Sequence, residues 1–212
     1  MEKLKKLVKK FNLWYSLLNE FRKRFFMKKR NIISLSGDLA SGKGTVSEIL
    51  MKKLNFGVYR NGEYFRKLAK EMSMSLADFG EYVESHPEID MKIENSAKEY
   101  ALDNDDFVID ARLGWYAVPE SFKVYLKVDI DEAAKRAFND EKRKDLENFS
   151  SFEEHKKALI ERFEEENERY FNLYGVRKDD MNNYDLVVDT TSLTPEEVAD
   201  IIIKEYKTWK NE

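Results

Sequence analysis

Apolar and polar residues alternate with two different periods along this chain. Short apolar runs, each four to seven residues long, lie at residues 32–35, 56–59, 107–110, 122–128 and 184–189. The longer stretches between them carry apolar residues at three- and four-residue steps, the spacing of one face of an α-helix. Short apolar strands that alternate with helices form βαβ units. The pattern therefore predicts an α/β fold in which a five-stranded parallel sheet lies between two layers of helices.

Residues that favour helix ends mark where these helices begin and stop. Ser75 and Ser151 are suited to an N-cap, and residues 151–154 have the spacing of a capping box. Pro87 suits a first helical position, and Gly175 suits a helix stop. With these boundaries we expect helices at residues 45–54, 61–72, from 75, 87–102, 131–138, 151–174 and from 194.

The first thirty residues differ from the rest of the chain in charge. They carry eleven Lys and Arg against two Glu, a formal charge of +9, which leaves −13 on the remaining residues. Residues 2–29 also have apolar side chains at helical spacing. We therefore divide the chain into a basic amphipathic N-terminal helix, residues 1–30, and a catalytic domain, residues 31–212.

The apolar face of this N-terminal helix must be covered, and two kinds of partner fit it. A basic amphipathic segment suits an anionic membrane surface, a nucleic acid or another protein. Alternatively, it is an extra helix that packs on the domain or on a second copy of the chain, with its lysines in solvent. Self-association and contact with an anionic surface both stay open for residues 1–30.

Composition limits the remaining chemistry. A chain of 212 residues with 42% apolar residues can bury one substantial core. The absence of cysteine excludes disulfides, thiolate metal sites and thiol nucleophiles, and it is compatible with the cytoplasm, where we expect the protein to act. No transmembrane segment is expected, because no window of membrane-spanning length is free of charge. No small-residue cleavage site follows the first helix, so secretion is not indicated.

The strongest chemical signal is a glycine-rich loop between a predicted strand and a predicted helix. Its spacing is that of the G-x-x-x-x-G-K phosphate loop, with the lysine at position 43. Backbone N–H groups of such a loop, together with the N-terminus of the following helix, cradle the phosphates of a nucleoside triphosphate. The residues expected to bind ATP phosphates are Gly37, Asp38, Leu39, Ala40, Ser41, Gly42, Lys43, Gly44 and Thr45. Gly44 stands where a magnesium-binding hydroxyl is usual, so Thr45 is the alternative candidate.

Two other strand ends carry charged residues. Ligands of an open parallel sheet gather outside the carboxyl ends of its strands. Asp110 and Arg112 follow the third strand, where a carboxylate can hold magnesium through water and a guanidinium can bind an acceptor phosphate. Gly62 and Arg66 follow the second strand, where the glycine allows a tight entry to a helix and the arginine reaches toward a phosphate.

The long helix near residues 151–174 contributes a further pair of cations. Arg162 and Arg169 lie seven residues apart, hence on one face, with Glu166 between them. They can stabilise a phosphoryl group in transfer, although a surface ladder of ion pairs would have the same spacing. His86 and His155 have no carboxylate or serine at a suggestive spacing, so we expect both at ordinary surface positions without a catalytic role.

Together these motifs resemble the archaeal-type cytidylate kinases, a branch of the P-loop nucleoside monophosphate kinases. The likeness covers about residues 31–206 and includes the phosphate loop, residues 62–66, 75–80, 87–90, 110–112 and 184–187, together with Arg162, Arg169-Tyr170 and Tyr174-Gly175. It implies a P-loop NTPase fold with a helical acceptor-binding region and a lid at residues 139–150. The implied reaction transfers a phosphoryl group from ATP, with Mg²⁺, to CMP or dCMP.

The resemblance also implies roles for the residues named above. Lys43 and the loop amides would hold ATP, Arg66 and Arg112 the acceptor phosphate, and Asp110 the metal. Arg162 and Arg169 would stabilise the migrating phosphoryl group. The chain departs from the family pattern at residues 39–40, where Pro-Gly is usual, at Asp38, and at Phe163, where an acidic residue is usual.

Two other functions compete with this interpretation. The same loop occurs in kinases that phosphorylate nucleosides or other small molecules. A nucleotide-gated binding module, with the loop as a switch and the basic helix for nucleic acid or membrane, belongs to a different class. A switch needs few cations beyond its loop, whereas transfer between two phosphates needs several. Four arginines near the predicted site therefore favour a kinase.

Overall fold

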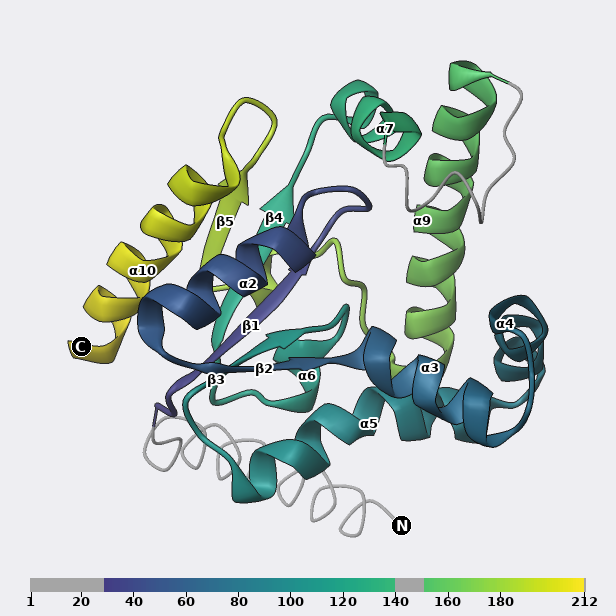
Figure 1. The fold of residues 1–212 in the computed structure, drawn as a ribbon, viewed down its shortest axis with the longest axis horizontal. Coiled ribbons are helices and arrows are strands. Elements are labelled where there is room, and N and C mark those ends of the chain that lie inside the picture. The colour runs from purple at the N-terminus through teal and green to yellow at the C-terminus, as the bar shows by residue number, and fades with distance from the viewer. Residues whose placement is uncertain (1–28, 140–150, 212) are drawn as a thin grey trace, which may run out of the picture.

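The centre of the protein is a five-stranded parallel sheet (Figure 1). The computed structural model describes residues 29–139 and 151–211. The strands are β1 (Ile32–Gly37), β2 (Gly57–Arg60), β3 (Phe107–Asp110), β4 (Phe122–Lys127) and β5 (Leu186–Asp189). Their order in the sheet is β2-β3-β1-β4-β5, and every neighbouring pair is parallel. The predicted fold class is confirmed.

The helices lie close to their predicted positions. They are α2 (Lys43–Leu54), α3 (Asn61–Glu71), α4 (Leu76–Ser85), α5 (Pro87–Asp103), α6 (Gly114–Ala117), α7 (Ile130–Asn139), α9 (Phe152–Tyr174) and α10 (Pro195–Asn211), with a 3-10 turn at Met181–Asn183. Ser75 and Ser151 cap α4 and α9 through their side chains, and Gly175 ends α9 in the left-handed conformation. Sequence periodicity missed α6 because four residues are too few to show a helical period.

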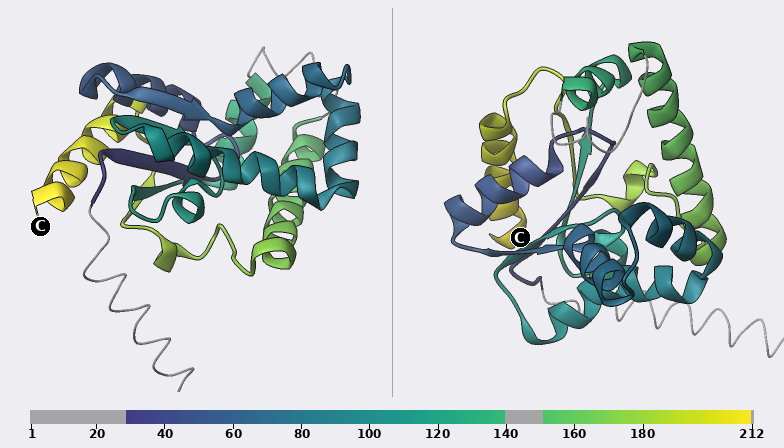
Figure 2. Two further views of the ribbon diagram at one scale, coloured as in Figure 1. Left: turned by 90° about the horizontal axis from the view of Figure 1, so that it is seen from below. Right: turned by 45° about the vertical axis from the view of Figure 1, so that its right-hand side comes forward.

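Alternation along β1 divides the core between the two faces of the sheet. Ile33 and Leu35 face the side covered by α2 and α10, in the cluster that also contains Leu50 and Ile202. Ile32 faces the other side, in a cluster with residues of α5 and α6. Figure 2 shows these helical layers on opposite sides of the sheet. The sheet is thus buried on both faces, as expected for parallel strands.

A group of helices lies beside the sheet, in the segment where the sequence predicts an acceptor-binding region. Helices α3, α4 and α5 share a small core around Phe79, which also contains Leu68, Ala69, Val83 and Ile93. Helix α9 is joined to the β3–α6 connection by a second cluster, in which Tyr170 packs with Leu113 and Trp115. Figure 1 places α9 across the molecule from α10. Helices α3, α4 and α5 on one side and helix α9 on the other thus lie beside the sheet, and residues of all four line one cavity.

Two predicted segments fall largely outside the described residues: the N-terminal helix, of which residues 1–28 are not described, and the lid, of which residues 140–150 are not described. Within residues 29–139 and 151–211, no helix is both long and apolar enough to cross a membrane.

The prediction that both histidines are surface residues is wrong for His155. Its side chain is buried on α9, near the ring of Phe138. Helices α7 and α9 pack against each other along this part of α9, which covers the imidazole. His86 is half-buried, with its ring stacked on Tyr82. Neither histidine lines the cleft described below.

Candidate active site

The phosphate loop runs from the end of β1 to the start of α2 in a conformation that its glycines permit. Gly37 has φ 148°, and a Cβ atom there would lie 2.3 Å from the carbonyl oxygen of Leu126. Gly42 has φ 89° and is the N-cap of α2, so no side-chain oxygen caps the first turn. The N–H groups at this helix start, with the positive end of the helix dipole, make an anion site.

Asp38 is held away from this anion site. Its amide donates to Leu126 O at 2.9 Å, and its carboxylate accepts hydrogen bonds from the Tyr125 hydroxyl at 2.5 Å and the Val128 amide at 2.9 Å. Asp38 is one of the loop residues expected to bind the nucleotide, and in this geometry its carboxylate bonds to β4 and the residue after it. Because its polar groups bond to residues of β4 and just beyond, Asp38 anchors the loop, and a carboxylate beside the phosphates is avoided.

Lys43 lies folded along the inside of the loop. Its ammonium group donates to Gly37 O and Asp38 O, each at 3.0 Å. Burial lowers the pKa of Lys43 to about 8, although nearby Asp110 acts in the opposite direction. A lysine held this way sits beside the loop amides as a point charge that can reach a phosphate.

Asp110 closes the floor of the site at the end of β3. Its carboxylate is 17% exposed, and its Oδ2 lies 3.9 Å from Arg60 Nε and 3.9 Å from the position of a Cβ on Gly44. Burial raises the pKa of Asp110, with Lys43 the main opposing charge. A lone carboxylate facing the phosphate loop fits magnesium, which usually binds one or two carboxylates together with phosphates and water.

No other acidic groups complete a metal cage in the described part of the chain, where no cluster of three or more His, Asp or Glu suits a metal ion. The oxygen donors at this end of the cleft include the Asp110 carboxylate and the hydroxyls of Ser41 and Thr45, which line the cavity. This donor set fits a magnesium ion whose remaining ligands come from the nucleotide.

A cleft with two parts runs from the phosphate loop toward α4. The first part, about 700 Å³, is lined by loop residues 39–45, by Asp110 and by Arg136, Thr190 and Pro195. The second part, about 760 Å³, lies among α3, α4, α5 and α9. Six residues line both parts: Asn61, Gly62, Arg66, Glu94, Arg112 and Arg162. The two parts therefore meet at a junction rich in arginine.

Arg66 is an exposed cation of this junction. It lies one turn into α3, and a Cβ added at Gly62 would be 3.6 Å from its Nη1. Among the residues that the structure describes, no carboxylate pairs with the Arg66 guanidinium. Its charge is therefore available to a ligand in either part of the cleft.

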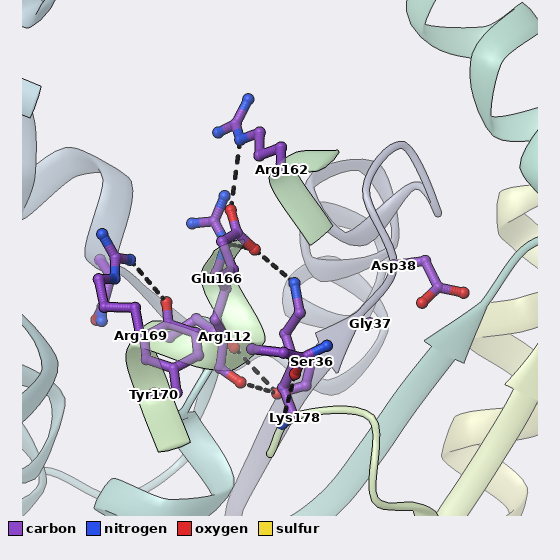
Figure 3. Close-up of polar contacts among 12 residues, drawn as sticks. Ser36, Gly37, Asp38, Arg112, Arg162, Glu166, Arg169, Tyr170 and Lys178 are labelled. Carbon is purple, nitrogen blue, oxygen red and sulfur yellow. Dashed lines mark hydrogen bonds and ion pairs between the residues drawn. The ribbon is translucent and has the colours of Figure 1, made fainter. Parts of the chain in front are cut away.

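Arg112 and Arg162 converge on one buried carboxylate (Figure 3). Glu166 accepts from Arg112 Nε at 2.8 Å and lies 3.4 Å from Arg162 Nε, and its second buried partner is the ammonium of Lys178 at 2.5 Å. Burial opposes ionisation of Glu166, but Arg112 and Lys178 overcome it and lower its pKa. The surface ladder considered for this helix is thus ruled out for Arg162, because its partner is buried and shared with another element.

Arg169 occupies a different place from Arg162. Its Nη1 lies 3.8 Å from Asp90 Oδ1 on α5, and its guanidinium carbon is 5.1 Å from the ring centre of Tyr170. Arg169 lines only the second part of the cleft. Arg162 and Arg169, which we expected to stabilise one phosphoryl group, thus lie at different places: Arg162 lines both parts of the cleft and Arg169 the second part.

Glu94 is a buried carboxyl at the junction. It accepts a hydrogen bond from Asn61 Nδ2 at 3.1 Å and one from the Tyr170 hydroxyl at 3.4 Å. Burial raises the pKa of Glu94 to about 7, and the nearby carboxylate of Asp90 adds to this, against Arg112 and Arg169. The acceptor part therefore holds acidic as well as basic groups near its walls.

Several residues of the cleft and of its supporting contacts were not singled out from the sequence. Arg60 could have been found, since it ends a strand at the ligand edge of the sheet. Glu94 carries a weaker signal, one helical turn after Asp90. No sequence signal marks Lys178, a lysine in a polar loop, or Arg136, which donates to the carbonyl groups of Thr190 and Thr191 at 2.7 and 3.1 Å. Their roles depend on contacts between segments far apart in the chain.

Comparison with known proteins places the chain beside kinases. The model of the cytidylate kinase-like family matches residues 32–192. A cytidylate kinase from Thermoplasma volcanium is 37% identical over 176 residues, which cover 81% of this chain and 88% of that protein. An S-adenosylmethionine-dependent nucleotide dehydratase from Lacinutrix mariniflava is 35% identical over 82% of this chain, but the match spans only 36% of that longer protein.

Solved structures support the fold. Shikimate kinase from Bacteroides thetaiotaomicron aligns with 82% of this chain and 96% of its own length, with a TM-score of 0.60. Its sequence identity to this chain is 14%, so the likeness concerns architecture alone.

Proposed function

Because the chain belongs to the cytidylate kinase-like family and is a nucleoside monophosphate kinase, we propose that it transfers the γ-phosphoryl group of ATP to CMP or dCMP. The products are ADP and the corresponding nucleoside diphosphate. Several relatives at 32–37% identity carry the name cytidylate kinase, which supports a cytidine nucleotide as the acceptor.

The two-part cleft is the observation that carries this proposal. One part begins at a phosphate loop, the other lies among helices beside the sheet, and they share a junction with Arg66, Arg112 and Arg162. Two nucleotides placed end to end would bring their phosphates together at this junction. A switch module would need a phosphate loop but no second cavity lined with arginines.

ATP would occupy the first part of the cleft. Lys43 and the amides at residues 39–45 would hold its phosphates. Arg136 lines the same part of the cleft and donates to Thr190 O at 2.7 Å. Mg²⁺ would be held by Asp110 through water, with Thr45 as a second ligand, and would neutralise charge on the phosphates.

The acceptor would occupy the second part. Arg66 and Arg112 would bind its phosphate, and Gly62 lets the start of α3 approach it closely. Arg169, held by Asp90 and Tyr170, would act at the acceptor side rather than on the group in transfer.

Transfer itself would depend on position and charge. A phosphoryl group in transfer spreads negative charge over its three equatorial oxygens, so the protein contributes mostly by aligning the reactants and stabilising that charge. Lys43 from the loop, Arg112 from the β3–α6 connection and Arg162 from α9 approach this point from three directions. Exclusion of water from the cleft would favour transfer to the acceptor over hydrolysis of ATP.

A panel of monophosphates tests the proposal. CMP, dCMP, UMP, AMP and GMP are each incubated with the protein, ATP and Mg²⁺, and both ADP and the new diphosphate are quantified. We expect diphosphate formation to be fastest with CMP or dCMP. ADP release that is equal with and without every monophosphate would contradict a monophosphate acceptor. A faster reaction with another monophosphate would reassign the base.

A further inference from the structure

We propose that Lys178 is a positioning residue of the transfer site: it holds the Glu166 carboxylate from behind, so that Glu166 aligns Arg112 and Arg162 toward the cleft. This inference rests on the proposed function, because it assigns Lys178 a part in arranging the cations that would bind the acceptor and the migrating phosphoryl group.

The first observation is that Lys178 is a buried lysine with a fixed backbone. Its side chain is 1% exposed. Its amide donates to Asn167 Oδ1 at 3.1 Å, and its carbonyl accepts from the Tyr184 hydroxyl at 2.7 Å. A lysine is almost never buried without a partner, because moving its charge out of water costs several kcal/mol. Two backbone hydrogen bonds therefore fix the position of Lys178, and one ion pair with Glu166 compensates its buried charge.

The second observation is where the ammonium points. Lys178 Nζ lies 2.5 Å from Glu166 Oε2 and 4.4 Å from the centre of the Phe163 ring. The aromatic face attracts the cation and keeps water from one side of it. The family usually has an acidic residue at position 163, which could pair with Lys178 in place of Glu166. Phe163 cannot form an ion pair, so it packs against the ammonium group and leaves Glu166 as its carboxylate partner.

The third observation is that Lys178 does not reach the ligand. Among the described residues, the walls of both parts of the cleft include Arg112, Arg162 and, in the acceptor part, Glu166, but not Lys178. Figure 3 shows Glu166 between the lysine and the two arginines. Lys178 therefore contacts the cleft through Glu166, while its charge also acts at longer range on Lys43.

The contacts of Glu166 explain how Lys178 would affect the two arginines. The carboxylate contacts the Nε atoms of Arg112 and Arg162, at 2.8 and 3.4 Å. For Arg112, the structure describes no protein partner for the terminal nitrogens, so they stay available to an acceptor phosphate. Lys178 Nζ and Arg112 Nε share Glu166 Oε2. Without the ammonium, Glu166 could rotate with Arg112 still paired to it, and the Arg112 guanidinium would move away from its place at the junction. A displacement of about 1 Å at such a site can reduce the rate by about 100-fold.

The test compares Lys178→Met, which keeps the length of the side chain without its charge, with Lys204→Met on the exposed part of α10. We expect Lys178→Met to raise the KM for the acceptor by about tenfold or more and to lower kcat, with little change in the KM for ATP. Lys178→Arg, which restores a cation, should recover part of the loss. Equal changes for both substrates, or no change, would overturn the proposal.

A double-mutant cycle separates positioning from a purely structural role. If Lys178 acts through the arginines, Lys178→Met should cost much less in an Arg112→Ala background than in the wild type. Additive effects would overturn the proposal. Should Lys178→Met not fold, Lys178→Gln replaces it in the same cycle.

Calorimetry that measures CMP binding in the absence of ATP tests this inference separately from the proposed function. Failure of the wild type to phosphorylate any monophosphate would refute the function. If CMP binds equally well to the wild type and Lys178→Met, the positioning role is refuted.

Discussion

The phosphate loop itself is made by consecutive residues 37–45, whereas the second part of the cleft is assembled from side chains on α3, α4, α5 and α9. The first uses backbone amides, a single lysine and glycines whose φ angles shape the turn. The second uses a network of buried charges, in which Glu166 and Asp90 hold arginines from distant parts of the chain. The loop is consequently a local structure, and the acceptor part depends on tertiary packing.

The largest effect should follow from removing the charge of the loop. Lys43→Ala should reduce phosphoryl transfer by about 1000-fold or more, because the charge acts where negative charge develops. Thermal unfolding should show a folded variant, since Lys43 contributes its ammonium only to two loop carbonyls. Steady-state kinetics of Lys43→Ala, with Lys52→Ala on the exposed part of α2 as the matched control, checks this. Turnover close to wild type in Lys43→Ala would remove this lysine from the site.

The loop should also be intolerant of a side chain at its first glycine. Gly37→Ala should lower the free energy of unfolding by about 3 kcal/mol or more, because its Cβ would meet Leu126 O at 2.3 Å in a backbone conformation that favours glycine. At the acceptor end, a Cβ on Gly62 has its nearest neighbour at 3.6 Å, so Gly62→Ala should change stability by less than about 1 kcal/mol. Urea unfolding of both variants makes the comparison, and equal losses would show that the loop is not the stricter region.

In the second part of the cleft, replacing a single arginine should change the KM for the acceptor and not the KM for ATP. Arg66→Ala should raise the KM for the acceptor by about 10- to 100-fold, the range expected for a lost hydrogen bond to a charged group, with the KM for ATP nearly unchanged. Lys67→Ala, one residue along α3 with a partner at Glu71, is the matched control. A parallel rise in both KM values would place Arg66 outside the acceptor site.

The smallest effect is a pH dependence of stability that comes from the acceptor part. Burial, with Asp90 on the same helix, raises the pKa of Glu94 from 4.5 to about 7, while Arg112 and Arg169 face it from other elements. The folded state therefore keeps a proton that the unfolded state loses, and stability from this group falls as the pH rises from about 4.5 to 7.

Glu94→Gln should flatten this decline by about 1 to 3 kcal/mol. Urea unfolding at about pH 5 and pH 8 measures it, with Glu99→Gln on the exposed side of α5 as the control. An unchanged slope in Glu94→Gln would show that Glu94 does not carry the pH dependence.

The contrast between the two regions also explains what the sequence could predict. Strand and helix positions follow from local periodicity, so the sheet, the caps at Ser75 and Ser151, and the stop at Gly175 were predicted correctly. The phosphate loop was recognisable because its residues are consecutive. The partners of the Asp38 carboxylate, Tyr125 and Val128, could not be named from the sequence, since they lie far from the loop along the chain.

The acceptor part was only partly predictable for the same reason. Arg66, Arg112 and Arg162 could be named because they follow strand ends or share a helix face. The separation of Arg169 from Arg162 depends on α5, which supplies Asp90. The burial of His155 by α7, and of Lys178 by Phe163 and Glu166, likewise arises from packing between elements that no local pattern encodes.

Direct occupation of both parts of the cleft by one molecule would test the arrangement most sharply. A bisubstrate compound that joins adenosine and cytidine through a chain of five phosphates would span the junction at Arg66, Arg112 and Arg162. We expect it to inhibit competitively against both ATP and CMP and to bind more tightly than either nucleotide alone. Competition with ATP only, or affinity no better than that of ATP, would contradict two nucleotides bound end to end.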